Sequence, residues 1–446
     1  METVVQNVWT KTKILVKALI IGGIVLILQI PTLLIQDLIK EREQRQKEAI
    51  AEVSSKWAKK QNITGPVLVL PFWQSNADSS NKNRTKHFAY FLPETLSITS
   101  TVSPKEKYRG IYKVMLYTSR VKLKGTFDSV ALDKLKIDPK DVIWNEAFVH
   151  INISDVKGLN EELKMQWNKQ VLTLSPEALE GAAMGSGLNA LLNLNNVEEV
   201  KHTDFAADMT LSGSEELLFT PIGKSTSVEM SAKWPHPSFT GDILPVNSKI
   251  SKDSFYANWK SVSQKRNFPQ QWKDNAFTIS NTNDPTNAIA NNINGNAFGT
   301  SLYVPVNSYQ KTMRSVKYSF LCILLTFAAF FLIETSNKKS VHPFQYGLVG
   351  LALVLFYTLL LSFSEYIGFD LSYGVASVAT IGLITWFVNG ILSSAKLTTV
   401  LAFVLLLVYT YVFTILQLQD YALLLGSIGL FVALAIIMHF SKKIQW

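Results

Sequence analysis

The sequence predicts a membrane protein with six α-helical spans, namely one N-terminal anchor and a C-terminal five-helix bundle, and a large β-rich α+β domain inserted between spans one and two. Three observations support this fold class. Apolar runs long enough to cross a bilayer occur at about 14–35 and repeatedly within 316–440. Lysines occur in alternate loops of the last third of the chain. The long middle stretch, 36–315, has the polar composition of a folded extramembrane domain.

The first apolar run, 14–35, is predicted to be a retained transmembrane anchor that follows a short cytoplasmic segment, 1–13. It is about 22 residues long, which is enough to cross a bilayer core roughly 30 Å thick. A cleaved signal peptide is the competing interpretation, but the run is too long and lacks a small-x-small exit. The next stretch, 36–60, is rich in helix-forming residues and predicts a juxtamembrane helix that continues out of the membrane.

The connections between the later apolar runs carry charges that alternate in sign. The predicted spans are about 316–333, 344–363, 371–392, 397–416 and 421–440. Lysines follow the first, third and fifth of these spans, at Lys338, Lys339, Lys396, Lys442 and Lys443. Only acids follow the second and fourth, at Glu365, Asp370 and Asp420. Because basic residues in short loops stay cytoplasmic, both termini, including the tail 441–446, are predicted to be cytoplasmic and 36–315 extracytoplasmic.

Basic residues on the outer flanks of the first two spans run against this orientation. Lys40 and Arg42 follow the first span, and Lys311, Arg314 and Lys317 stand at the start of the second. Long domains are translocated largely regardless of their charge. The short loops of the bundle therefore decide the predicted orientation.

The middle domain is predicted to be β-rich, either sandwich-like or α+β. Apolar and polar residues alternate with period two in 96–102, 147–153, 205–211 and 228–232. In 147–153 this alternation places His150 on the polar face of a strand, where a structural or solvent-facing role is favoured over metal binding. Two stretches rich in Gly, Asn and Ala, about 181–200 and 281–300, are predicted to be loops or linkers.

The charge and cysteine content exclude some classes of function. The net charge of +9 is spread along the chain and forms no basic cluster, so nucleic-acid binding is not expected. The single cysteine, Cys322, lies in an apolar run, so the extracytoplasmic domain is expected to fold without a disulfide.

No catalytic, cofactor-binding or metal-binding residue is predicted, and no cofactor. The six histidines have no metal-ligand spacing to one another or to the cysteine. The segment 221–226, PIGKST, resembles the end of a phosphate-binding loop, but Leu218 stands where the first glycine is required, so a hairpin turn is favoured. No charged residue lies near the centre of a predicted span, which lowers the expectation of ion-coupled transport.

The segment 233–245, KWPHPSFTGDILP, is the most unusual part of the predicted domain. Its three prolines, one glycine and two large aromatic residues disfavour regular structure. Trp234, His236 and Phe239 are therefore candidate residues of a partner-binding loop. The alternative is a tightly packed structural crossover between strands.

Six pieces of the sequence resemble the CreD family of bacterial inner-membrane proteins. In chain order they are LIKEREQRQKEAI, ITGPVLVLPF, YRGIYKVMLY, KWPHPSFTGDILP, QKRNFPQ and HPFQYGLVGLALVLFYTLLLSFSEYIGF. The resemblance extends over about 30–440. It implies a single anchor, a large periplasmic domain over 36–315, a C-terminal membrane bundle and a link to cell-envelope integrity and envelope stress. It implies no catalytic residue.

Three hypotheses for the function follow. The first is a non-enzymatic inner-membrane protein whose periplasmic domain binds an envelope protein or polymer, with membrane lipids around its bundle. The second is a transporter or flippase for a lipid or another amphiphile. The third is a membrane-bound hydrolase, which no sequence motif supports. The sequence leaves the oligomeric state open.

Overall fold

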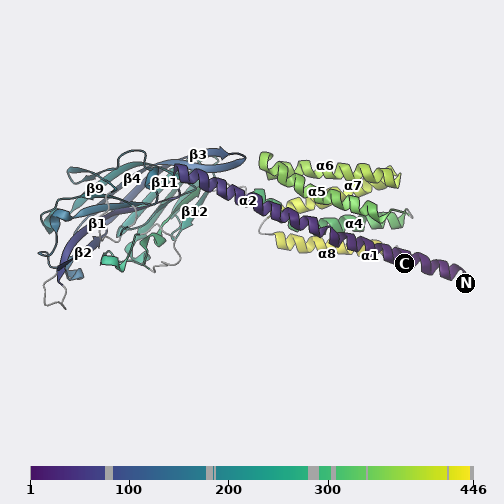
Figure 1. The fold of residues 1–446 in the computed structure, drawn as a ribbon, viewed down its shortest axis with the longest axis horizontal. Coiled ribbons are helices and arrows are strands. Elements are labelled where there is room, and N and C mark those ends of the chain that lie inside the picture. The colour runs from purple at the N-terminus through teal and green to yellow at the C-terminus, as the bar shows by residue number, and fades with distance from the viewer. Residues whose placement is uncertain are drawn as a thin grey trace. The chain divides into compact units, whose positions relative to one another are not determined.

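The computed structural model describes residues 2–75, 84–176, 184, 187–279, 291–302, 308–337, 340–418 and 421–441 (Figure 1). Packing divides the chain into two compact units. Unit 1 combines Met1–Lys47 with Val306–Trp446, and unit 2 is Glu48–Pro305. The middle of the chain is β-rich and is flanked by helices, as the sequence predicts. Several charged loop residues, including Lys338, Lys339 and Asp420, lie outside the described residues.

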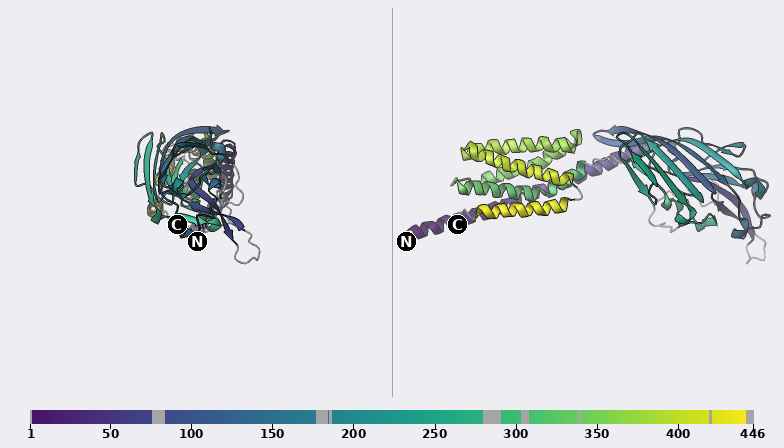
Figure 2. Two further views of the ribbon diagram at one scale, coloured as in Figure 1. Left: turned by 90° about the vertical axis from the view of Figure 1, so that its left-hand side faces the viewer. Right: turned by 180° about the vertical axis from the view of Figure 1, so that it is seen from behind.

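Unit 1 is helical. Its helices are α1 (Glu2–Ile27), the first part of α2 (Gln29–Trp57), α3 (Ser308–Lys317), α4 (Ser319–Ser336), α5 (Pro343–Ile367), α6 (Phe369–Leu392), α7 (Ala395–Gln417) and α8 (Ala422–Ser441). Leu28 N donates to Ile24 O at 2.9 Å, so α1 and α2 join as one helix that is continuous from Leu15 to Trp57. The start of α1 and the end of α8 lie at the same end of the unit (Figure 2).

Four helices of the described chain are long and apolar enough to cross a membrane, and a fifth span results if α3 and α4 count as one. These two helices meet at an angle of 44°. The apolar part of α8, Leu423–Ile436, is shorter. Large apolar side chains such as Trp386 and Phe431 are exposed on the helices, as lipid-facing surfaces require. The count of six spans stays a prediction.

Local sequence sets the helix ends of the bundle. His342 accepts a hydrogen bond from Phe344 N and Gln345 from His342 N, which forms a capping box at the start of α5 with Pro343 in the first turn. Gly368 separates α5 from α6 with φ +78°, a conformation that glycine adopts without strain. Because Gly368 is the one residue between them, α5 and α6 are antiparallel neighbours.

Unit 2 contains two eight-stranded sheets in the described residues. The first sheet is formed by β1 (Gln61–Ser75), β2 (Arg84–Phe91), β5 (Phe148–Ile153), β8 (Gly187–Leu191), β10 (Glu216–Phe219), β12 (Pro237–Gly241), β15 (Gln271–Lys273) and β16 (Phe298–Leu302). Its main path is β12-β16-β10-β1-β2-β15, and β5 pairs with both β1 and β8. β12 is therefore an edge strand.

The second sheet has the order β13-β14-β11-β3-β4-β9-β6-β7. Its strands are β3 (Thr95–Arg109), β4 (Tyr112–Phe127), β6 (Lys164–Trp167), β7 (Gln170–Thr173), β9 (Thr203–Ser214), β11 (Ser225–Ala232), β13 (Asn247–Ile250) and β14 (Phe255–Val262). Inward residues of both sheets, among them Leu68, Ile98 and Trp259, belong to one hydrophobic core. The predicted alternation in 96–102 appears in β3 as strict alternation of exposed and buried residues.

The structure corrects several local predictions for this unit. All six residues of β5 are buried, including His150 at 1% exposure, so of the two roles expected for His150 the structural one fits and the solvent-facing one does not. Part of the predicted loop 181–200 is strand β8, and the end of the predicted loop 281–300 contains the 3₁₀ turn Ile293–Asn296 and the first residues of strand β16. The start of that second stretch, 281–290, lies outside the described residues. The segment 221–226 is not a hairpin turn, because β10 and β11, which it joins, belong to different sheets.

Candidate functional site

A polar cleft of about 610 Å³ opens on unit 2 beside the edge strand β12. Its walls come from the end of β12, from the segment after β14 and from the short 3₁₀ turn Ile293–Asn296; the residues are Asp242, Gln264, Lys265, Arg266, Asn267, Asn292, Gly295 and Asn296. Every one of these side chains, glycine aside, is charged or an amide. Such a lining suits a ligand that hydrogen-bonds and carries charge.

Backbone geometry holds the two loops of the cleft in place. Gly241 has φ +98°, and a Cβ at this position would lie 2.2 Å from Ala297 O. The next residue, Asp242, donates its backbone N–H to the same carbonyl at 3.2 Å. Across the cleft, Asn267 N donates to Asn296 Oδ1 at 3.2 Å. Only glycine fits where β12 approaches β16, and this close approach positions Asp242 at the rim.

Arg266 is a half-buried cation in the wall of the cleft. Its Nη1 donates to Ile222 O at 2.6 Å, its Nη2 contacts the Gln270 side chain, and its guanidinium lies 4.5 Å from the ring centroid of Phe268. In the described part of the chain its Nε is buried without a hydrogen-bond partner, and it forms no ion pair. Burial lowers the pKa of this guanidinium to about 10, so it remains charged at neutral pH.

The charge of the cleft is therefore positive overall. Lys265 is exposed next to Arg266 and, like it, forms no ion pair with a described carboxylate. Asp242 is the acid among the lining residues. A buried or half-buried cation without a counter-charge favours an anionic group beside it. The cleft can thus bind a ligand that presents an anion together with hydrogen-bonding groups.

The three candidate residues of 233–245 do not line the cleft. Phe239 packs edge-to-face on Phe255 and Trp259, with ring centroids 6.0 and 5.6 Å away. Trp234 is half-buried and donates its Nε1–H to His236 O at 3.0 Å, whereas the His236 side chain is exposed. Part of the segment is thus regular edge strand that packs on the core. Partner binding by these residues stays a prediction.

A hydrogen-bonded chain of Thr85, His87 and Asp274 lies at the end of β2. Thr85 Oγ1 is 2.9 Å from His87 Nε2, and His87 Nδ1 is 3.0 Å from Asp274 Oδ2. This order of hydroxyl, imidazole and carboxylate matches that of a nucleophilic triad. Thr85 is exposed and also donates to Gln74 O at 3.4 Å, which places it in the hydrogen bonding of a strand end. No group that could hold a metal occurs among the described residues.

A buried ionic network joins three helices of unit 1. Lys17 of α1 forms an ion pair with Glu334 of α4, and the Tyr346 hydroxyl of α5 donates to Glu334 Oε2 at 2.8 Å. Val341 N donates to Glu334 Oε1 at 2.9 Å. The Glu334 side chain is 6% exposed and that of Lys17 21%. The network attaches the first apolar helix to the bundle through hydrogen bonds as well as through packing.

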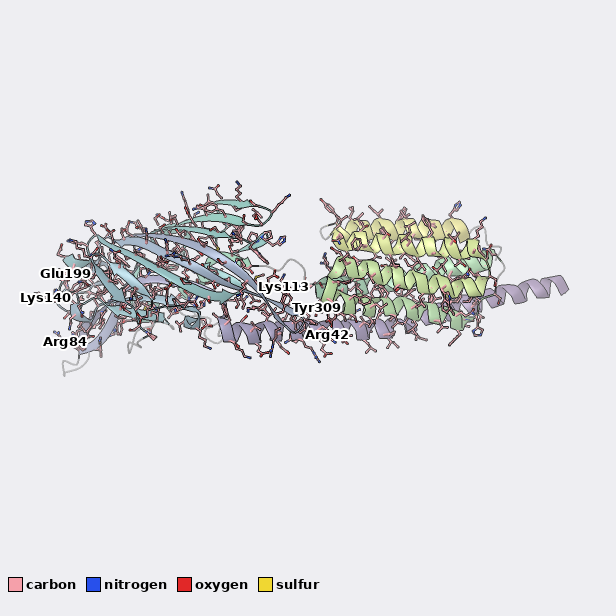
Figure 3. All side chains as sticks on the ribbon, turned by 90° about the horizontal axis from the view of Figure 1, so that it is seen from above. Arg42, Arg84, Lys113, Lys140, Glu199 and Tyr309 are labelled. Atoms are coloured by element: carbon pink, nitrogen blue, oxygen red, sulfur yellow. The ribbon has the colours of Figure 1, made fainter. Side chains whose placement is uncertain are left out.

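A second polar network joins α2, α3, α5 and α6. Arg42 lies 4.0 Å from Glu365, which also accepts a hydrogen bond from the Tyr309 hydroxyl at 2.9 Å. Lys311 lies 3.5 Å from Asp370. Figure 3 labels Arg42 and Tyr309 near the same end of the unit. Arg42 and Lys311, two of the basic residues that run against the predicted orientation, therefore pair with acids at the connection predicted to be extracytoplasmic.

Sequence reasoning missed both the cleft and the Lys17–Glu334 pair. The run QKRNFPQ contains two adjacent basic residues, Lys265 and Arg266, followed by an aromatic residue and a proline, which is a local signal for one wall of the cleft. It contains nothing that indicates the residues of the other wall. Glu334 is visible as an isolated acid at the end of an apolar run. Its partner is 317 residues away, which no local pattern indicates.

Comparisons with known proteins agree on one family. The family model described as "Inner membrane protein CreD" matches residues 13–446. The Inner membrane protein CreD of Escherichia coli (strain K12) is 32% identical over 434 residues, which cover 95% of this chain and 92% of that protein.

A similar solved structure is a zinc metallopeptidase from Deinococcus radiodurans, with 10% identity and a TM-score of 0.20 over 38% of this chain and 39% of that one. A likeness this weak carries no argument about fold or function. The family match over nearly the whole length, together with the relative from Escherichia coli, confirms the resemblance found in the sequence: the chain belongs to the CreD family of multi-pass inner-membrane proteins.

Proposed function

We propose that this protein supports cell-envelope integrity or the envelope stress response without catalysing a reaction, and that its β-rich unit lies in the periplasm and binds an envelope component. The observation that carries the proposal is the polar cleft, in which Lys265 and Arg266 have no described counter-charge. The ligand is a protein or polymer of the envelope that presents an anionic group and several hydrogen-bonding groups. Amide side chains suit such a ligand because each both donates and accepts.

Three observations support the periplasmic placement. Lysines occur in alternate loops of the bundle, which favours a cytoplasmic position for both termini. The start of α1 and the end of α8 lie at one end of unit 1, consistent with termini on one side of the membrane (Figure 2). Arg42 and Lys311, which oppose this orientation, are paired with Glu365 and Asp370. The two acids offset two of the basic charges at the face that we place outside.

Thiol labelling tests the orientation. Cys322 is buried, so new cysteines at exposed positions are labelled selectively. We expect an impermeant maleimide to label Val171→Cys in intact spheroplasts and Lys396→Cys only after lysis. The reverse pattern would place unit 2 in the cytoplasm and overturn the proposal.

Photo-crosslinking in cells tests binding at the cleft. A photoreactive residue at Gln264, on the cleft wall, is expected to capture a discrete envelope component. The matched control is Val171, which is 69% exposed on the edge strand β7 and is not a cleft residue. We expect Lys265→Glu to reduce the adduct at 264 about ten-fold, the effect of losing a charged hydrogen bond.

The crosslinking result has a clear contrary outcome. Equal adducts at 264 and 171, or an adduct that is insensitive to Lys265→Glu, would show that the cleft does not select the partner. Lys265 is exposed, so its replacement leaves the fold intact. Arg266 is unsuitable for this test because it also supports the chain through Ile222 O and Phe268.

A further inference from the structure

The β3–β4 hairpin ends in a cluster of basic residues. The strands pair without interruption from Thr95 with Thr126 to Arg109 with Tyr112, and a two-residue turn that includes Gly110 at φ +59° joins them. The last five residues of β3 are all exposed. The end of the hairpin carries four basic side chains and one acid: Lys105, Lys107, Arg109 and Lys113, with Glu106.

Two of these basic residues are paired and two are not. Arg109 donates to Glu52 Oε1 at 2.9 Å, and Lys113 lies 2.5 Å from Glu106. Lys105 and Lys107 form no ion pair with any carboxylate of the described chain. Tyr108, between Lys107 and Arg109, is 66% exposed. The hairpin tip, residues 105–113, thus presents free ammonium groups beside a projecting phenol.

The hairpin tip lies at the end of unit 2 where the chain enters from the apolar helix. Glu52, the partner of Arg109, is on α2 four residues after Glu48, the first residue of the unit. Lys56 donates a hydrogen bond to Glu52, and this bond together with the charge of Arg109 lowers the pKa of that carboxyl. Figure 3 shows Lys113 at the opposite end of unit 2 from Arg84, Lys140 and Glu199.

We propose that the hairpin tip binds the headgroups of anionic phospholipids in the membrane that holds unit 1. Lysine ammonium groups near a negatively charged bilayer are attracted to it, and tyrosine favours the boundary between headgroups and water. The family membership supplies the membrane, and the helix that contains the first apolar run continues without a break to Glu52, the residue that pairs with Arg109 of the hairpin tip. An acidic protein partner would need the same charges, and it would give a hairpin tip whose position does not depend on the lipid.

Fluorescence quenching in nanodiscs tests this proposal with the full-length protein. The probe is an environment-sensitive fluorophore on Tyr108→Cys, in a Cys322→Ser background, and the quencher is a lipid with a nitroxide on its headgroup. We expect strong quenching in discs that contain phosphatidylglycerol and weak quenching in discs of phosphatidylcholine alone. High salt should abolish the difference, because it screens the exposed charges.

Charge reversal separates the hairpin tip from the overall charge of unit 2. Lys105→Glu with Lys107→Glu removes two groups that attract anionic lipid, and each contributes about five-fold to the binding equilibrium. We therefore expect the ratio of lipid-bound to unbound hairpin tip to fall about 25-fold or more. Lys134→Glu with Lys140→Glu is the matched control. Both of these lysines are exposed, the pair changes the net charge equally, and Lys140 lies at the other end of the unit.

The outcomes are decisive. Loss of quenching in the tip variant, with the control unchanged, supports the proposal. Quenching that is independent of phosphatidylglycerol, absent from both discs, or equally reduced in both variants overturns it. The proposal does not depend on the cleft, because no residue of the tip lines it.

Discussion

The Lys17–Glu334 pair allows a quantitative test of how the first apolar helix is held to the bundle. The perturbation is Glu334→Leu, which removes the acceptor of three donors: the Lys17 ammonium, Val341 N and the Tyr346 hydroxyl. The side chain of Glu334 is 6% exposed and that of Lys17 21%. The variant therefore leaves Lys17 as a mostly buried charge without a partner.

The magnitude follows from these contacts. Removing one partner of a buried ion pair costs about 3–5 kcal/mol, and the partial exposure of Lys17 places the loss near the lower end. Lys17→Met should cost less, about 1–3 kcal/mol, because Glu334 keeps its other two donors. Glu334→Gln keeps an acceptor and loses the charge, so we expect about 1.5–3 kcal/mol. The double variant should be more stable than the sum of the single losses predicts, by about 1–3 kcal/mol.

The assay must report on unit 1 alone, because a chain of two units need not unfold in one step. The described α-helices belong to unit 1 apart from the end of α2, so far-UV circular dichroism in the helical band follows this unit. Unfolding by a titration of sodium dodecyl sulfate in mixed micelles gives the free-energy differences. Lys40→Met is the matched control, since Lys40 and Asp37 form an exposed ion pair on the same helix. We expect it to cost less than about 0.5 kcal/mol.

One result would refute this reasoning. If the losses for Lys17→Met and Glu334→Leu add to within about 0.5 kcal/mol in the double variant, the two side chains are not energetically coupled. The ion pair would then add nothing to the stability of unit 1, and the first helix would be held to the bundle by apolar contacts alone.

Three further predictions concern unit 2. Burial lowers the pKa of His150 from 6.5 to about 4, so between these pH values the unfolded chain binds more protons than the folded chain. The free energy of unfolding should therefore be unaffected by His150 above pH 6.5 and should fall as the pH drops toward 4, by up to about 3 kcal/mol. His150→Asn should flatten this dependence in thermal unfolding at a series of pH values. Phe239→Ala should cost about 2–3 kcal/mol, because it removes the ring contacts with Phe255 and Trp259; unchanged stability with a lost crosslink would instead assign Phe239 to partner binding. A fluorophosphonate probe should label wild-type protein no more than Thr85→Ala, and labelling that depends on Thr85 would establish a hydrolase.

Length, periodicity and charge placement are properties of contiguous residues, and the sequence by itself determined what depends on them. The apolar runs predicted helices α4 to α8, because a run of about 20 apolar residues has few alternatives to a membrane span. The strict alternation in 96–102 predicted the burial pattern of β3. The six family-like pieces predicted the family, which the comparisons confirm over residues 13–446.

Only the tertiary structure decided which distant residues meet. The alternation around His150 left a structural and a solvent-facing role open, and the structure selects the structural one because both faces of β5 are buried. The cleft needed Asp242, Lys265 and Asn296 brought together from three segments. Lys17 and Glu334, 317 positions apart, pair because both sit at helix positions where an unpaired charge would be costly. Local sequence can state that a buried charge requires a partner, but the fold alone supplies the partner.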